Sequence, residues 1–99
     1  MNAADVIRLR HMLEAAETAL MLIEGETRAS LDTDIKLRLA LTKAIEVVGE
    51  AASKTTQETR AAHPSIPWPA MVGMRNVLIH GYFSIDLEKL WDTAITQRS

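Results

Sequence analysis

The stretch that decides the fold is IKLRLALTKAIEVVGEAASK, residues 35–54. Its apolar residues recur at spacings of three and four, which is the period of a helix, but they occupy two stripes rather than one. One stripe consists of Ile35, Leu39 and Ile45, and the other of Leu37, Leu41, Ala44 and Val48. A helix that is apolar over so much of its circumference usually lies centrally and contacts neighbours on two sides. We therefore expect residues 35–54 to form the central helix of an all-α protein.

The residues before this stretch predict another long helix. Apolar residues recur every three or four positions between residues 6 and 23, which indicates one buried stripe. The stripe consists of Val6, Leu9, Leu13, Ala16, Leu20 and Ile23. Gly25 is placed to end this helix. Residues 25–34, GETRASLDTD, then form a turn in which Asp32 or Thr33 could cap the central helix.

The residues after the central stretch predict two or three shorter helices. Residues 55–63, TTQETRAAH, form the first, and the three prolines of HPSIPWP, residues 63–69, must end it. A further helix begins near residues 67–69 and ends near Gly81. Asp86 is a suitable N-cap for a last helix, whose apolar positions are Leu87, Leu90, Trp91, Ala94 and Ile95. The sequence predicts a single domain over residues 1–99, built as an up-and-down bundle of four or five helices.

The composition limits the class of function. The 99 residues are 47% hydrophobic and 24% charged, as in an ordinary globular domain. A net charge of −2 argues against a protein that binds phosphates mainly through its overall charge. Cysteine is absent, which excludes disulfides and zinc–thiolate sites, and no apolar stretch reaches the ~20 residues of a membrane span. We expect a cytoplasmic protein without a membrane segment. Because two helices of about twenty residues expose more apolar surface than short partners can cover, we also expect a homodimer.

Polar residues gather in RNVLIHGYF, residues 75–83. On a helix, Arg75 and Tyr82 share one edge, whereas Asn76 and His80 are neighbours on another. Arg75 and His80 lie roughly 140° apart, so one straight helix does not bring them together. A shared site needs either a looser helix near Gly81 or a second chain. The residues alone also allow structural roles, such as a buried ion pair for the Arg and a helix-end contact for the His.

The sequence resembles a known family in two blocks. These are IEVVGEAASK, residues 45–54, and IPWPAMVGMRNVLIHGYFSIDLEKLWDTA, residues 66–94. Together they resemble the HepT-like branch of the HEPN superfamily. The specific part is the motif R-N-x-x-x-H-x-Y, which is met by Arg75, Asn76, His80 and Tyr82.

The resemblance implies a HEPN-like helical dimer that brings two R-x-x-x-x-H motifs into one cleft. It implies a metal-independent endoribonuclease toxin of a type VII-like toxin–antitoxin system, with no cofactor and with Arg75 and His80 as catalytic residues. Asn76 would support them. The expected antitoxin is a minimal nucleotidyltransferase, which would silence the toxin by transferring AMP to Tyr82. A non-catalytic HEPN dimer that serves such a partner as an adaptor, and a plain helical dimerisation domain, are the alternatives.

Two pairs of residues outside the motif are further candidate sites. Glu46 and Glu50 lie four apart on one helix face, which favours a solvated face with Glu50 bonded to Lys54. Since Glu50 belongs to the resembling block, it could instead hold a motif residue in place. His11 and Glu14 could supply only half of a metal-ligand set. We therefore expect both residues to lie on the exposed face of a surface helix.

Overall fold

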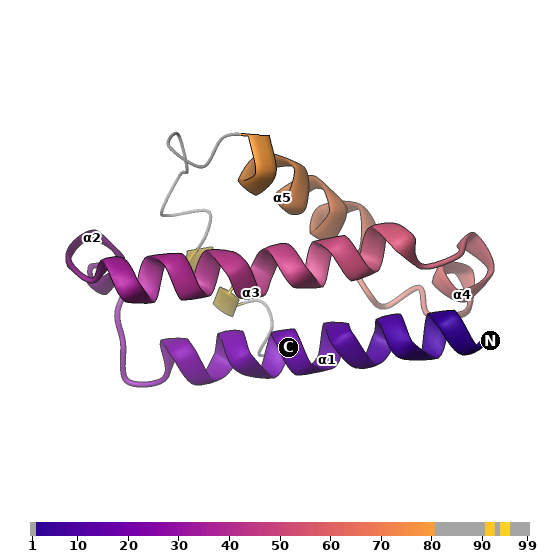
Figure 1. Cartoon of the computed structure of the whole chain (residues 1–99), viewed down its shortest axis with the longest axis horizontal. Helices are drawn as coiled ribbons and strands as arrows, with labels where there is room; N and C mark the ends of the chain where they lie inside the picture. The colour runs from indigo at the N-terminus through magenta and orange to yellow at the C-terminus, as the bar shows by residue number, and fades with distance from the viewer. Residues whose placement is uncertain (1, 81–90, 93, 96–99) are drawn as a thin grey trace.

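The computed structural model describes residues 2–80, 91–92 and 94–95, and the side chains of residues 77–80 lie outside this description. The described chain forms five helices, which are α1 (Ala3–Ile23), α2 (Ser30–Thr33), α3 (Ile35–Lys54), α4 (Gln57–Ala62) and α5 (Trp68–His80). These elements confirm the all-α prediction (Figure 1). The predicted last helix lies largely outside the described residues, although Trp91, Asp92, Ala94 and Ile95 are helical.

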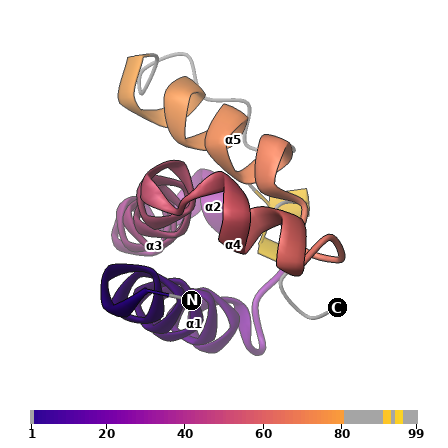
Figure 2. The ribbon, with the colours of Figure 1, turned by 90° about the vertical axis from the view of Figure 1, so that its right-hand side faces the viewer.

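Helix α3 occupies the centre of the bundle. It runs antiparallel to α1 on one side and contacts α5 on the other (Figures 1 and 2). The prediction from residues 35–54 is therefore confirmed. No described helix combines the length with the apolar character that a membrane span requires.

The turn between α1 and α3 differs from the prediction in two ways. Residues 30–33 form the short helix α2, whereas the sequence indicated only a turn. Asp34 caps α3 by accepting a hydrogen bond from the backbone N–H of Leu37 at 3.1 Å, so the prediction of Asp32 or Thr33 was wrong by one or two residues. Gly25 does follow the end of α1, with a φ of 75° that favours glycine.

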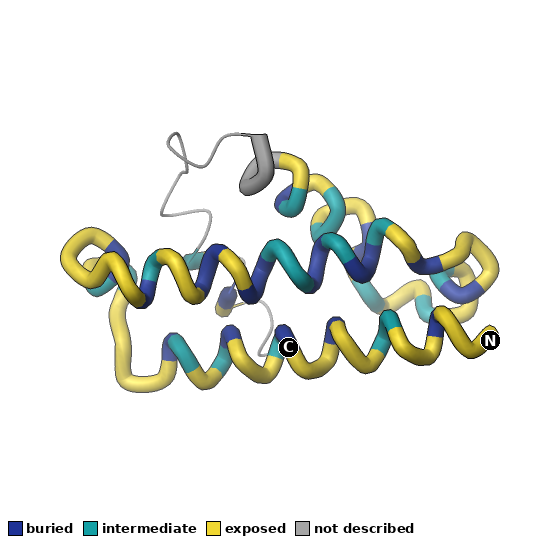
Figure 3. Tube along the Cα trace, viewed as in Figure 1, coloured by how far each residue is buried: buried dark blue, intermediate teal, exposed yellow. Residues whose placement is uncertain are grey.

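The buried face of α1 also differs from the prediction. Its buried residues are Asp5, Met12, Ala15, Ala19 and Ile23. Val6 and Leu13 of the predicted stripe are exposed, at 41% and 59%. The actual face is rotated by roughly 80° from the predicted one. Small alanines form much of it, so the backbones of α1 and α3 can approach closely, and the burial along both helices is visible in Figure 3.

One of the two predicted stripes of α3 is confirmed in full. Leu37, Leu41, Ala44 and Val48 are all buried. Ile45 of the second stripe is buried too, but Ile35 and Leu39 remain exposed, at 58% and 48%.

The N-terminus of the chain is tied to α4 through a buried carboxylate. Asp5 is fully buried and accepts hydrogen bonds from the hydroxyls of Thr56 and Thr59, both at 2.5 Å, and from the backbone N–H of Thr56 at 3.2 Å. The Arg8 guanidinium lies 3.2 Å from the same carboxylate. The hydrogen bonds from Thr56 and then Thr59 lower the pKa of Asp5 from 3.8 to about 2. This contact fixes α4 against the beginning of α1.

The chain between α4 and α5 is held by Arg60 and Trp68. The Arg60 guanidinium donates to the carbonyls of Ala52, at 2.8 Å, and Thr55, at 3.1 Å, which satisfies the C-terminal end of α3. Trp68 is buried, and its indole N–H donates to the carbonyl of His63 at 3.1 Å. The proline segment is thereby folded back, so that α5 begins beside the last turns of α3.

Candidate functional site

Helices α3 and α5 pack tightly where Gly49 faces Arg75. A Cβ atom placed on Gly49 would overlap the Cβ of Arg75 and lie 2.6 Å from the carbonyl oxygen of Met71. Only glycine therefore allows α5 to pack here at its observed distance. This contact places the backbone of Arg75 directly against the face of α3 that carries Glu50.

The Arg75 guanidinium is held by a carboxylate from α3. Its Nε donates to Oε2 of Glu50 at 2.7 Å, the length of a strong charge-assisted hydrogen bond. The Arg75 side chain is 28% exposed and that of Glu50 37%, so the pair lies at the surface and not in the core. Glu50 thus fixes the direction of the guanidinium and leaves it accessible to solvent.

Glu50 has a second cationic partner. Its Oε1 lies 3.2 Å from the ammonium of Lys54, one turn further along α3. The hydrogen bond from Arg75, and then that from Lys54, lower the pKa of Glu50, against a smaller effect of burial that raises it. Both roles that the sequence suggested for Glu50 are present together, because it pairs with Lys54 and also holds a motif residue.

Asn76 contacts the same guanidinium. Nη1 of Arg75 donates to Oδ1 of Asn76 at 2.8 Å. Nε and Nη1 are therefore occupied by Glu50 and Asn76, and no described residue bonds to Nη2. An arginine fork oriented in this way is suited to a phosphate oxygen, with the remaining N–H groups as donors.

The other two motif residues are placed only in part. His80 is the last residue of α5, and its side chain lies outside the described residues. Tyr82 also lies outside them. The structure therefore brings Arg75, Asn76 and Glu50 together, and the roles of His80 and Tyr82 stay predictions.

The described residues offer no evident metal site. Across residues 2–80 and the described part of the last helix, no group of three or more His, Asp or Glu side chains is arranged to hold a metal ion. His11 and Glu14 are both exposed on α1, in agreement with the surface role favoured by the sequence.

Comparison with known proteins identifies relatives over most of the chain. The sequence profile of the family described as "Ribonuclease HepT-like" matches residues 12–98. A "Probable ribonuclease HepT" of Thermococcus cleftensis is 39% identical over 85 residues, which cover 82% of this chain and 77% of the relative. A "Putative RNase" of Caldanaerobacter subterraneus is 30% identical over 90% of this chain and 80% of its own length. A "Putative RNase" of Methanocaldococcus jannaschii is 46% identical over 55 residues, or 56% of this chain and 50% of its own. No solved structure matches the chain significantly.

Proposed function

The chain belongs to the ribonuclease HepT-like family, and we propose that it is a metal-independent endoribonuclease with Arg75 and His80 as its catalytic residues. The observation that carries this proposal is the Arg75 guanidinium, which Glu50 and Asn76 hold in one direction at a half-buried surface. A cation fixed before the substrate arrives can stabilise charge on a phosphate without reorganising during the reaction.

The proposed reaction uses the 2′-OH of RNA as the nucleophile. The 2′-oxygen attacks the adjacent phosphorus and the bond to the 5′-oxygen breaks, which leaves a 2′,3′-cyclic phosphate and a free 5′-OH. Arg75 neutralises the negative charge that builds on the non-bridging phosphate oxygens. His80 exchanges a proton with the attacking or the leaving oxygen, a task suited to a side chain that titrates near neutral pH.

Two copies of the chain are part of the proposal. Arg75 and His80 lie on the same helix but roughly 140° apart, so a homodimer would bring the Arg of one copy near the His of the other. We place α5 near the two-fold axis for this reason.

We propose that a minimal nucleotidyltransferase antitoxin controls the activity through Tyr82. AMP on the phenol oxygen would add bulk and negative charge to the edge of the motif on which Arg75 lies. If this is correct, incubation with the antitoxin and ATP adds AMP to the wild type, and Tyr82→Phe escapes modification.

RNA cleavage by the purified chain tests the proposed function. Single-stranded RNA should be cut in the presence of EDTA, and its products should carry 2′,3′-cyclic phosphate ends. Loss of cleavage in EDTA, or products with 5′-phosphate ends, would reject the mechanism. A protein that cuts no RNA but binds the nucleotidyltransferase would instead be the non-catalytic adaptor.

A further inference from the structure

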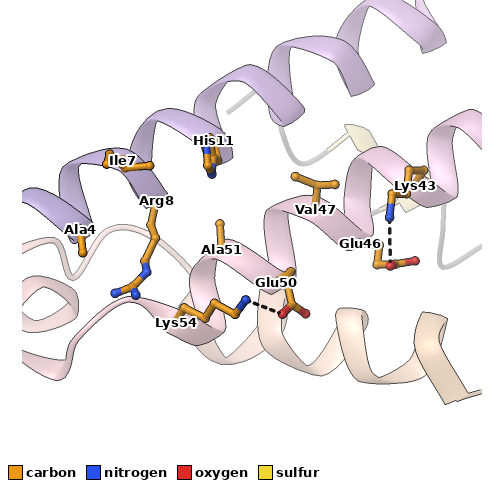
Figure 4. Close-up of a pocket in the computed structure, with 10 residues that line it drawn as sticks. All are labelled: Ala4, Ile7, Arg8, His11, Lys43, Glu46, Val47, Glu50, Ala51 and Lys54. Atoms are coloured by element: carbon orange, nitrogen blue, oxygen red, sulfur yellow. Dashed lines mark hydrogen bonds and ion pairs between the residues drawn. The ribbon is translucent and has the colours of Figure 1, made fainter.

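A groove runs between the first part of α1 and residues 43–54 of α3. Its volume is about 610 Å³. In Figure 4, Ile7 and His11 approach it from α1, whereas Val47 and Ala51 project from α3 toward α1. The described motif residues on α5 do not line it, but Glu50, which holds the Arg75 guanidinium, does.

The groove is locally cationic in a chain with a net charge of −2. Its lining contains the cations Arg8, Lys43 and Lys54 and the carboxylates of Glu46 and Glu50. Arg8 also pairs with the buried Asp5, and Glu50 with Arg75, so the groove and its margin hold four cations and three carboxylates. Lys43 lies 3.5 Å from Glu46 with 70% of its side chain exposed, and an exposed pair of this kind contributes little to stability. Lys43 can therefore turn to a phosphate at small cost.

The lining between these charges is aliphatic. Ile7 is 51% exposed although it lines the groove, and Val47 and Ala51 line it from α3. Aliphatic side chains can cover the faces of bases, but they neither stack like aromatic rings nor read base edges by hydrogen bonds. A nucleic acid bound here would be held without preference for its sequence.

The groove is continuous with the candidate site through Glu50. One oxygen of this carboxylate contacts Lys54 in the groove, and the other contacts Arg75 on α5. We propose that the groove binds single-stranded RNA that flanks the bond to be cut, with Lys43 and Lys54 contacting successive parts of the phosphate backbone. This proposal rests on the proposed ribonuclease function and adds a binding surface to it.

Lys43→Glu tests the groove, and Lys36→Glu is the matched control. Lys36 lies two turns earlier on α3, is exposed, and does not line the groove, while its charge change is identical. The probe is a short mixed-sequence 2′-O-methyl oligoribonucleotide, which keeps the phosphates but lacks the nucleophile. Fluorescence anisotropy with the full chain should show Kd raised about tenfold by Lys43→Glu, with a salt dependence weaker by about 0.7 in log–log slope. Lys43→Arg should restore binding, and Lys36→Glu should resemble the wild type.

The outcomes separate the groove from the ribonuclease proposal. If the wild type binds and cuts RNA but Lys43→Glu weakens binding no more than Lys36→Glu, the groove proposal is wrong and the enzyme proposal stands. If the wild type neither binds nor cuts RNA, both proposals fail. If Lys43→Glu changes the oligomeric mass and leaves RNA binding unchanged, the groove is a protein contact, and the proposed RNA site is again rejected.

Discussion

Arg75 owes its position to two residues on α3, and each makes a different contribution. Gly49 lets the Arg75 backbone approach α3, and Glu50 accepts a hydrogen bond from the guanidinium at 2.7 Å. In this arrangement Glu50 can affect the rate of the reaction without contacting the substrate. It acts through Arg75, so we regard it as a positioning residue.

Replacing Glu50 should therefore reduce turnover more than stability. In Glu50→Gln the charge-assisted contact to Arg75 is lost, and a misdirected guanidinium should lower kcat by about tenfold to a hundredfold. The unfolding free energy should change by less than about 1 kcal/mol, because the pair is partly exposed. Steady-state cleavage kinetics and urea unfolding measure the two effects. Glu17→Gln, an exposed charge removal on α1, is the control, and equal kcat values for the two variants would contradict the positioning role.

Asp5 should make stability dependent on acid pH. Its pKa is about 2 in the folded chain and 3.8 ordinarily, so the unfolded chain binds more protons between these values. The stabilisation is complete above the ordinary pKa and disappears as the pH falls through about 2. Asp5→Asn should lower the melting temperature at neutral pH and converge on the wild type near pH 2. Glu26→Gln, in the exposed turn after α1, should follow the wild type throughout, and a pH-independent gap between Asp5→Asn and wild type would contradict this account.

At the scale of the helices, the sequence predicted the elements better than their faces. The bounds of α3 follow from the spacing of its apolar residues. The break at the prolines follows from the backbone chemistry of proline. Both are local properties of the sequence. The buried face of α1 depends on which of its sides packs against α3. That side carries Ala15 and Ala19, whereas Val6 and Leu13 are exposed. The Arg75–Glu50 contact joins residues 25 positions apart, so the sequence could suggest it only through the resembling block.

The crossing of α3 and α5 depends on the missing side chain of Gly49. Gly49→Ala should push α5 away and cost about 1–3 kcal/mol of unfolding free energy, because its Cβ would overlap Arg75. Gly73→Ala on α5 is the matched control. A Cβ at Gly73 meets nothing within 4 Å in the described chain. Because alanine favours the helix more than glycine does, Gly73→Ala should instead raise the unfolding free energy by ~0.5–1 kcal/mol. Urea unfolding followed by tryptophan fluorescence compares them, and equal stability of the two variants would refute the proposed close approach.

At the scale of the whole molecule, the single chain leaves large apolar side chains uncovered. Those exposed among the described residues and outside the groove are Val6, Leu13, Met21, Ile35, Leu39 and Ile95. They are consistent with the predicted homodimer, since burial of apolar surface is the main driving force of association. Light scattering at micromolar concentration should give twice the chain mass of 11.0 kDa. A mass of one chain at that concentration would remove the basis for a shared cleft.

The proposed enzyme cuts RNA with Arg75 and His80 and without a metal ion. The most direct measurement is the rate of single-stranded RNA cleavage in EDTA by the wild type, Arg75→Ala and His80→Ala, each first shown to have the wild-type fold and mass. We expect chelator-resistant cleavage by the wild type and a loss on the order of 10³-fold or more in each variant, since these residues act in the same step. Cleavage that persists in either folded variant at close to the wild-type rate would contradict it.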